Sequence, residues 1–217
     1  MGIEMENRKE LFEKYNAKED EIRGRIYDFS KIKKMGDGVL LSELCFCICA
    51  ANSSAEAAWK AQIGLVEKEL LYSNSRGEIS QVLLNSGVRF HNNKAKYIIE
   101  ARKKLFEEGK LGGYLQSAGD EGELRNMLAK EITGLGMKEA SHFLRNTGLG
   151  KEIAILDRHI LKNLEKYGAI GSIPKSLSDK QYIEIEGKMR KFAERIKIPM
   201  EHLDLLFWSE ETGIIFK

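Results

Sequence analysis

The stretch that decides the fold is EITGLGMKEASHFLRN, residues 131–146. Two glycines one residue apart, Gly134 and Gly136, separate two segments with helical patterning. Because glycine permits a positive φ, such a pair is typical of a tight turn between two helices. The second helix then begins with unpaired backbone N–H groups that can bind a phosphate. The sequence therefore predicts a helical hairpin, and on spacing alone it is either an anion site or a plain turn.

Lys138 falls in the first turn of the second predicted helix, where the helix dipole disfavours a positive charge. We expect it to share a polar face with His142 and Arg145, opposite a buried face formed by Met137, Ala140, Phe143 and Leu144. One interpretation is a solvated lysine. The other is an amine nucleophile, kept neutral by the dipole, by partial burial and by neighbouring cations.

A second feature follows in AILDRHILKNLEKYG, residues 154–168, which predicts another helix with Asp157 at its start. Aspartate is a common N-cap, and this role alone explains its position. A carboxylate at a helix N-terminus also stays ionised, so it can stabilise positive charge that develops nearby. Both roles remain open from the sequence.

The rest of the chain indicates an all-α protein. Helical periodicity recurs in residues 56–71, 92–108, 121–131 and 180–197, with glycine-containing breaks between segments and no convincing strand. In residues 56–71 the apolar positions expected to face the core are Trp59, Ile63, Val66 and Leu70. About ten helices with short connections predict an all-α fold.

Composition limits the other possibilities. The 217 residues carry a net charge of +2, which leaves nucleic acid open as a partner. The longest apolar run, residues 39–51, is too short to span a bilayer, and the charged N-terminus offers no signal peptide. We expect a soluble intracellular protein without a membrane partner. No further ligand residues surround Cys45, Cys47 and Cys49 at metal-site spacing, so we expect buried thiols and no metal.

Two motifs together resemble a known family. ITGLGMKEA (132–140) resembles the helix-hairpin-helix motif of the base-excision DNA glycosylases, and ILDRHIL (155–161) resembles the VDTHV element of that superfamily. Two looser matches are LCFCICAANSSAEAAW (44–59), similar to the helix and loop near the lesion, and VRFHNNKAKYIIEAR (88–102), similar to the helix that follows. The matches run from residue 44 to residue 168 in the order of the family.

Further features resemble one subgroup, the compact 8-oxoguanine DNA glycosylase/lyases of archaea and some bacteria. No cysteine follows Cys49, unlike in the iron–sulfur glycosylases, and the ending HLDLLFWSEETGIIFK (202–217) is similar to the C-terminus of this subgroup. The resemblance implies a two-lobed all-α fold with the active cleft between the lobes. We expect one lobe at 36–150, with the hairpin at 132–140, and a second lobe formed by 1–35 and 151–217.

The resemblance also implies a reaction on double-stranded DNA containing 8-oxoguanine. Lys138 is expected to form a Schiff base with the sugar, and Asp157 to stabilise the positive charge on the sugar. No cofactor is expected. We expect the protein to act as a monomer in the prokaryotic cytoplasm, at the nucleoid. Gly134, Gly136, Lys94 and Lys96 are expected to bind phosphates. Asn52 and Arg89 are expected to fill the lesion gap and read the opposing cytosine. Base recognition is expected to fall to Phe90, Asp204, Trp208 and Lys217. A lyase for another oxidised base, or a DNA-binding module without catalysis, remains an alternative.

Overall fold

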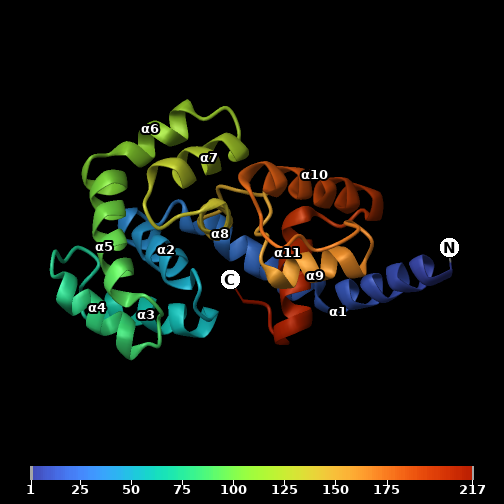
Figure 1. The fold of residues 1–217 in the computed structure, drawn as a ribbon, viewed down its shortest axis with the longest axis horizontal. Coiled ribbons are helices and arrows are strands. Elements are labelled where there is room, and N and C mark those ends of the chain that lie inside the picture. Colours follow the sequence, from blue (N-terminus) through green and yellow to red (C-terminus); the bar gives the residue numbers. More distant parts are fainter. Residues whose placement is uncertain (1, 217) are drawn as a thin grey trace. The chain divides into compact units, whose positions relative to one another are not determined.

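The computed structural model describes residues 2–216, with side chains described for residues 6–115 and 117–216. The helices are α1 (Gly2–Ile32), α2 (Asp37–Ala50), α3 (Ala55–Glu67), α4 (Arg76–Asn85), α5 (His91–Arg102), the π-helical η1 (Lys103–Glu107), α6 (Lys110–Ser117), α7 (Glu121–Glu131), α8 (Met137–Asn146), α9 (Arg158–Lys166), α10 (Asp179–Ile196) and α11 (Met200–Thr212) (Figure 1). No strand occurs between residues 2 and 216, so the predicted all-α class is confirmed.

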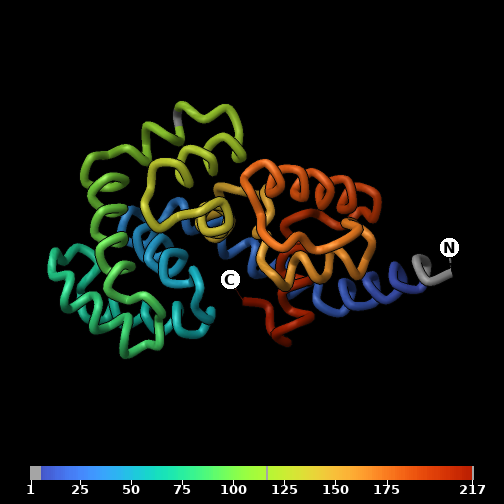
Figure 2. The backbone as a smooth tube through the Cα atoms, in the orientation of Figure 1, coloured from blue at the N-terminus to red at the C-terminus, as the bar shows by residue number. Residues whose placement is uncertain are grey.

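The chain divides into two compact units. We call Lys31–Leu149 the hairpin unit, because it contains the turn between α7 and α8, and Met1–Ser30 with Gly150–Lys217 the terminal unit. Figure 2 follows the backbone of the hairpin unit from α2, in blue, to α8, in yellow. Within the described part of the chain, no helix has the length and apolar character needed to cross a bilayer.

The hairpin unit is built around α2, which contacts α3, α5 and α8. Every side chain of α2 from Leu40 to Cys49 is buried. A helix that is apolar on all sides is stable only when other elements surround it, so its composition explains its central place. The three cysteines lie on this helix with their thiols buried and outside any disulfide, as the sequence predicted.

The predicted core face of α3 is wrong. Trp59, Ile63 and Val66 are exposed, and the side that is buried carries Ala57, Ala58, Ala61, Gln62 and Leu65. Small side chains allow two helices to approach closely, which favours the alanine side against α2. The amide of Gln62 then donates to Ser42 Oγ and Glu43 Oε1, each at 2.9 Å. A buried polar side chain is tolerated there because it is hydrogen-bonded.

The terminal unit joins the first helix to the last three. Glu210 of α11 forms an ion pair with Lys14 of α1, with 2.7 Å between Oε2 and Nζ. Nearby, Tyr15 of α1 and His202 of α11 share a buried hydrogen bond of 2.8 Å between the phenol oxygen and Nδ1. Helix α11 also packs on α9 and α10. Segments from opposite ends of the sequence therefore form one core.

Candidate active site

The two glycines of the predicted hairpin occupy their positions for different structural reasons. Gly134 has φ +96°, and a Cβ built there would lie 2.9 Å from both Cβ and Cδ2 of Tyr97. Only glycine fits such a backbone conformation and such a close approach without strain. Gly136 has an ordinary φ of −88° and is the N-cap of α8. The tight turn is therefore dictated at Gly134, and Gly136 opens the helix.

We expect Gly134→Ala to lower the free energy of unfolding by about 2–4 kcal/mol, because a positive φ and a packing clash add. Gly136→Ala is the matched control. Its Cβ would meet only Glu139 Oε2, at 3.1 Å, which is the end of a flexible side chain. That control should lose about 1 kcal/mol or less. Urea unfolding of both variants measures the difference, and equal losses would show that Gly134 is not the strained position.

Lys138 lies in the first turn of α8, and its side chain is 28% exposed. Its Nζ lies 3.2 Å from Glu139 Oε1, so its immediate neighbour is a carboxylate rather than the cations that we expected. The Nζ atom would have to leave this ion pair before it could reach another atom as a nucleophile.

Glu139 is held in place by the hairpin itself. Its other oxygen, Oε2, accepts a hydrogen bond from the N–H of Gly136 at 3.3 Å. This is the returning half of a capping box, in which the third residue of a helix bonds back to the N-cap. The same carboxylate thus closes the start of α8 and pairs with Lys138.

The predicted polar face of α8 is wrong. His142 and Arg145 are buried, as are Ser141 and Asn146. The reason is that α8 packs against both α2 and α7, so that two of its faces are covered. The ring of His142 packs edge-on against Phe46 of α2, with centroids 5.4 Å apart. Lys138 is the basic residue of α8 that keeps a partly exposed side chain.

Asp157 is the N-cap of α9. Its Oδ1 accepts hydrogen bonds from the backbone N–H groups of His159, at 2.8 Å, and Ile160, at 2.9 Å. Across residues 2–216, no hydrogen bond reaches the second oxygen, Oδ2. The two roles left open by the sequence are therefore compatible, since one oxygen caps the helix and the other is available.

The segment that leads to Asp157 is extended and is held by side chains of α10. Tyr182 Oη donates to the carbonyl of Ala154 at 2.6 Å and accepts from the N–H of Leu156 at 3.1 Å. Glu186 Oε2 accepts from the N–H of Ala154 at 2.8 Å. Buried backbone groups need such partners when no sheet supplies them. These contacts fix the backbone that leads into α9 and hence the position of Asp157.

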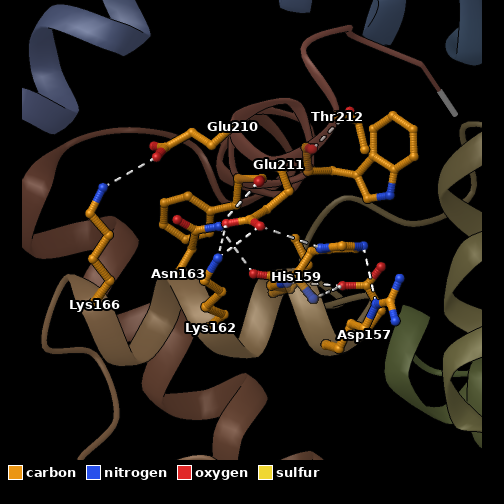
Figure 3. Close-up of polar contacts among 12 residues, drawn as sticks. Asp157, His159, Lys162, Asn163, Lys166, Glu210, Glu211 and Thr212 are labelled. Atoms are coloured by element: carbon orange, nitrogen blue, oxygen red, sulfur yellow. Dashed lines mark hydrogen bonds and ion pairs between the residues drawn. The ribbon is translucent and has the colours of Figure 1, made fainter.

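Helix α9 is tied in turn to α11, as Figure 3 shows. Lys162 Nζ binds both oxygens of Glu211 at 2.8 and 2.9 Å, and His159 Nδ1 lies 3.9 Å from the same carboxylate. The buried amide of Asn163 donates to the carbonyl of Phe207 at 3.2 Å. The ion pair with Lys162 holds the pKa of Glu211 below its ordinary value. Asp157 and the C-terminal helix therefore belong to one connected framework.

The structure corrects the prediction for Lys94. Its side chain is only 4% exposed, and its ammonium donates to the carbonyls of Cys49 and Ala51 and to Ser53 Oγ. An ammonium has three donors, so all are used inside the protein and none remains for a phosphate. Lys96, two residues later, is exposed, and its ion pair in the described part of the chain is with Glu100, at 3.5 Å.

The predicted lesion-gap residues, and Phe90, which is predicted to contact the base, lie on two turns of the hairpin unit. Asn52 follows α2, whereas Arg89 and Phe90 precede α5, and all three are exposed. The guanidinium of Arg89 lies over the ring of Phe90, 5.4 Å from its centroid. Asn52 and Phe90 both have a positive φ, of 55° and 57°.

Two of the predicted base-recognition residues, Asp204 and Trp208, lie in α11. Asp204 is buried within the terminal unit, and Trp208 is partly exposed. The indole of Trp208 stacks on Phe216, with ring centroids 6.1 Å apart. Lys217 lies outside the described residues. Lys138 therefore belongs to the hairpin unit, and Asp157 and Trp208 to the terminal unit.

Residues 22–198 match the Ogg-HhH family model, described as 8-oxoguanine DNA glycosylase. The chain belongs to this family. An 8-oxoguanine DNA glycosylase/AP lyase of Fusobacterium nucleatum is 42% identical over 206 residues, covering 94% of each chain. The resemblance inferred from the two motifs is confirmed.

Solved structures agree with this assignment. A crystal structure of the Thermotoga maritima 8-oxoguanine DNA glycosylase matches with a TM-score of 0.87 and 33% identity, over 99% of this chain and 100% of that one. The Methanocaldococcus jannaschii 8-oxoguanine glycosylase/lyase, crystallised with a 15mer DNA containing 8-oxoguanine, matches with a TM-score of 0.86 and 36% identity, over 97% and 99%. The predicted helix-hairpin-helix glycosylase fold is confirmed.

Several residues of this family member that shape the site were not singled out from the sequence. Glu139 could have been found, because it stands three positions after the N-cap Gly136, the spacing of a capping box. Tyr182 and Glu186 are one helical turn apart on the buried side of α10, and a glutamate on an apolar face indicates a buried acceptor. Lys94 was singled out as a phosphate-binding residue, and its sequence neighbours gave no indication that it is buried.

Proposed function

We propose that this protein is a DNA glycosylase and AP lyase that excises 8-oxoguanine from duplex DNA. The observation that carries the proposal is the family match over residues 22–198, which include the hairpin, Lys138 and Asp157. Relatives at 42% and 38% identity are named 8-oxoguanine DNA glycosylase/AP lyase. The protein works as a monomer on chromosomal DNA, in the cytoplasm of a prokaryotic cell, and needs no cofactor for the chemistry described next.

The reaction begins with extrusion of the damaged nucleotide, since its sugar is not accessible inside a stacked duplex. As the glycosidic bond lengthens, positive charge grows on the deoxyribose. The carboxylate of Asp157 stabilises this charge through Oδ2, while Oδ1 keeps its two hydrogen bonds to the start of α9. The base leaves with the electron pair of the broken bond.

Lys138 supplies the nucleophile for the second part of the reaction. Its ammonium first gives up a proton, for which Glu139 Oε1, at 3.2 Å, is the nearby acceptor. The free amine bonds to C1′, and opening of the sugar ring gives an iminium. This group withdraws electrons, so a proton leaves C2′ and the bond from C3′ to its phosphate oxygen breaks. Water then hydrolyses the iminium and frees Lys138.

DNA is held mainly through its phosphates, which are contacted without regard to sequence. The turn at Gly134 and Gly136 and the N-terminus of α8 provide backbone N–H groups and a positive dipole end. Exposed Lys96 adds a cation. These groups share the hairpin unit with Lys138, so binding a phosphate there brings the backbone of the DNA to the nucleophile.

We assign recognition of the base to two aromatic side chains and to Lys217. Phe90 and Trp208 offer stacking surfaces, and Asp204 is buried in the helix that carries Trp208. 8-Oxoguanine has an N7–H donor where guanine has an acceptor, so a main-chain oxygen of Lys217, as the acceptor for this N–H, favours the oxidised base. Asn52 and Arg89 occupy the gap and face the opposing cytosine.

Deleting Lys217 should reduce discrimination between 8-oxoguanine and guanine by about tenfold, because a lost hydrogen bond of this kind is worth roughly 1–3 kcal/mol. General affinity for DNA should change little. Base-release rates on the two bases, together with binding to undamaged duplex, measure this. Unchanged discrimination would remove the terminal residue from base recognition.

The function is tested with duplexes that carry 8-oxoguanine, thymine glycol or an undamaged guanine opposite cytosine. We expect base release and strand cleavage on the first, and covalent trapping by borohydride. Trapping on thymine glycol in preference to 8-oxoguanine would instead identify a lyase for another oxidised base. Binding without release or trapping on any lesion would identify a module that only binds DNA.

A further inference from the structure

We propose that Lys94 is a positioning residue, which together with Ser53 locks the two turns that enter the lesion gap. The inference rests on the proposed function, because it concerns how the gap residues Asn52 and Arg89 and the stacking residue Phe90 are presented. It replaces the phosphate-binding role that the sequence suggested for Lys94. The inference is based on hydrogen bonds that converge on the buried ammonium of Lys94, between the two turns.

The ammonium of Lys94 closes the end of α2. From the first turn of α5 it donates to the carbonyl of Cys49 at 2.8 Å and to the carbonyl of Ala51. The last carbonyls of a helix lack partners within the helix, and a cation is favourable at that end. Lys94 therefore ties the C-terminus of α2 to the N-terminus of α5.

Ser53 joins the same cluster from the loop after α2. Its Oγ accepts one hydrogen bond from Lys94 Nζ at 3.0 Å and another from the backbone N–H of Arg89 at 2.9 Å. The first of the two turns thus contacts the second directly and also through Lys94. One buried cluster sets the spacing of both.

The residues that this cluster supports are exposed and conformationally costly. Asn52 and Phe90 both adopt the left-handed backbone region, with φ of 55° and 57°. Asparagine visits this region readily, but it is unusual for a bulky residue such as phenylalanine. Phe90 is 57% exposed, so packing of its own ring does not explain the conformation. Strained residues persist where the surrounding structure fixes them, and here the hydrogen bonds of Ser53 and Lys94 do so.

A buried ammonium is itself costly, which argues for a specific purpose. Burial lowers the pKa of Lys94, and the nearby Lys138 and Arg89 act in the same direction, whereas Glu139 opposes them. Burial also raises the pKa of Cys49 to about 12, so its thiol provides no counter-charge at neutral pH. Three neutral oxygens satisfy the ammonium instead. A methionine would fill the same space without desolvating a charge, but it could not hold the two turns.

Rigid gap-filling turns matter most when the lesion is paired. Extrusion of 8-oxoguanine from a stacked pair with cytosine costs free energy, and side chains that occupy the vacated space offset that cost. The same turns matter less when the lesion faces an abasic-site analogue, since there is no pair to break. The ratio of base-release rates on these two duplexes therefore reports on how well the turns are positioned.

We would measure single-turnover base release on both duplexes for Lys94→Met and Ser53→Ala. The expected result is a loss of about tenfold or more on the lesion paired with cytosine, and a much smaller loss on the lesion opposite the abasic analogue. Lys60→Met is the control, because Lys60 is exposed on α3 and its ion pair is with Glu56, at 2.7 Å. It should leave the ratio unchanged. Ser53→Ala keeps the test decisive if Lys94→Met does not fold.

Equal losses on both duplexes, or a lower unfolding midpoint with an unchanged ratio, would overturn the inference and leave Lys94 with a purely structural role. Failure of the proposed function looks different, since the native protein would then release no base from either duplex. Rates for the native protein therefore separate the two outcomes before any variant is compared.

Discussion

Lys138→Gln is expected to abolish borohydride trapping on duplex DNA containing 8-oxoguanine. Strand cleavage should fall by about 10³-fold or more, because glutamine has no amine that can bond to C1′. Glutamine is of similar length, so the fold of α8 should be kept. The ion pair with Glu139 is lost, but Glu139 retains its bond to the N–H of Gly136. Affinity for the duplex should stay within about threefold, as a single lost cation contributes little.

The matched control for this variant is Lys60→Gln. Lys60 is also a lysine of the hairpin unit with one carboxylate partner, Glu56, but it is far more exposed. It should trap and cleave as well as the native protein. If Lys138→Gln were trapped to the same extent as the native chain, the nucleophile would have to be another amine.

Asp157→Asn is expected to lower base release by about 10²–10⁴-fold while the protein remains folded and binds DNA. Asparagine is as good an N-cap as aspartate, and its side-chain oxygen can accept the bonds from the N–H groups of His159 and Ile160. The variant therefore removes the negative charge but keeps the cap. Stability should change by less than about 1 kcal/mol.

Asp120→Asn provides the same exchange at a cap without a proposed catalytic role. Asp120 caps α7, and its Oδ1 accepts from the N–H of Glu123 at 2.8 Å. This control should release base at the native rate. Activity of Asp157→Asn close to that of the native protein, or a parallel loss of activity and stability, would reduce Asp157 to a structural cap.

The features that the sequence predicted correctly depend on neighbours along the chain. The turn at Gly134 follows from local backbone geometry, and Asp157 caps the helix that begins at the next residue. The subgroup and the all-α fold followed from motifs and helical periodicity. Such features need only a few consecutive residues, so a single sequence contains the information.

The errors concern contacts between distant segments. Lys94 looked like a surface cation because its acceptors, at Cys49, Ala51 and Ser53, lie more than forty positions earlier. The apolar residues of α3 suggested the wrong buried face, because the alanines on the other side allow closer packing on α2. Both outcomes depend on which helices surround a residue, and periodicity does not specify that.

The most direct test of the catalytic assignment is to identify the amino acid that becomes bonded to the sugar. The native protein would be incubated with duplex DNA containing 8-oxoguanine opposite cytosine, reduced with borohydride, digested and analysed by mass spectrometry. The expected result is a reduced sugar adduct on the peptide that contains Lys138, and on that lysine alone. An adduct on another lysine or on the N-terminal amine, with Lys138 unmodified, would contradict the mechanism.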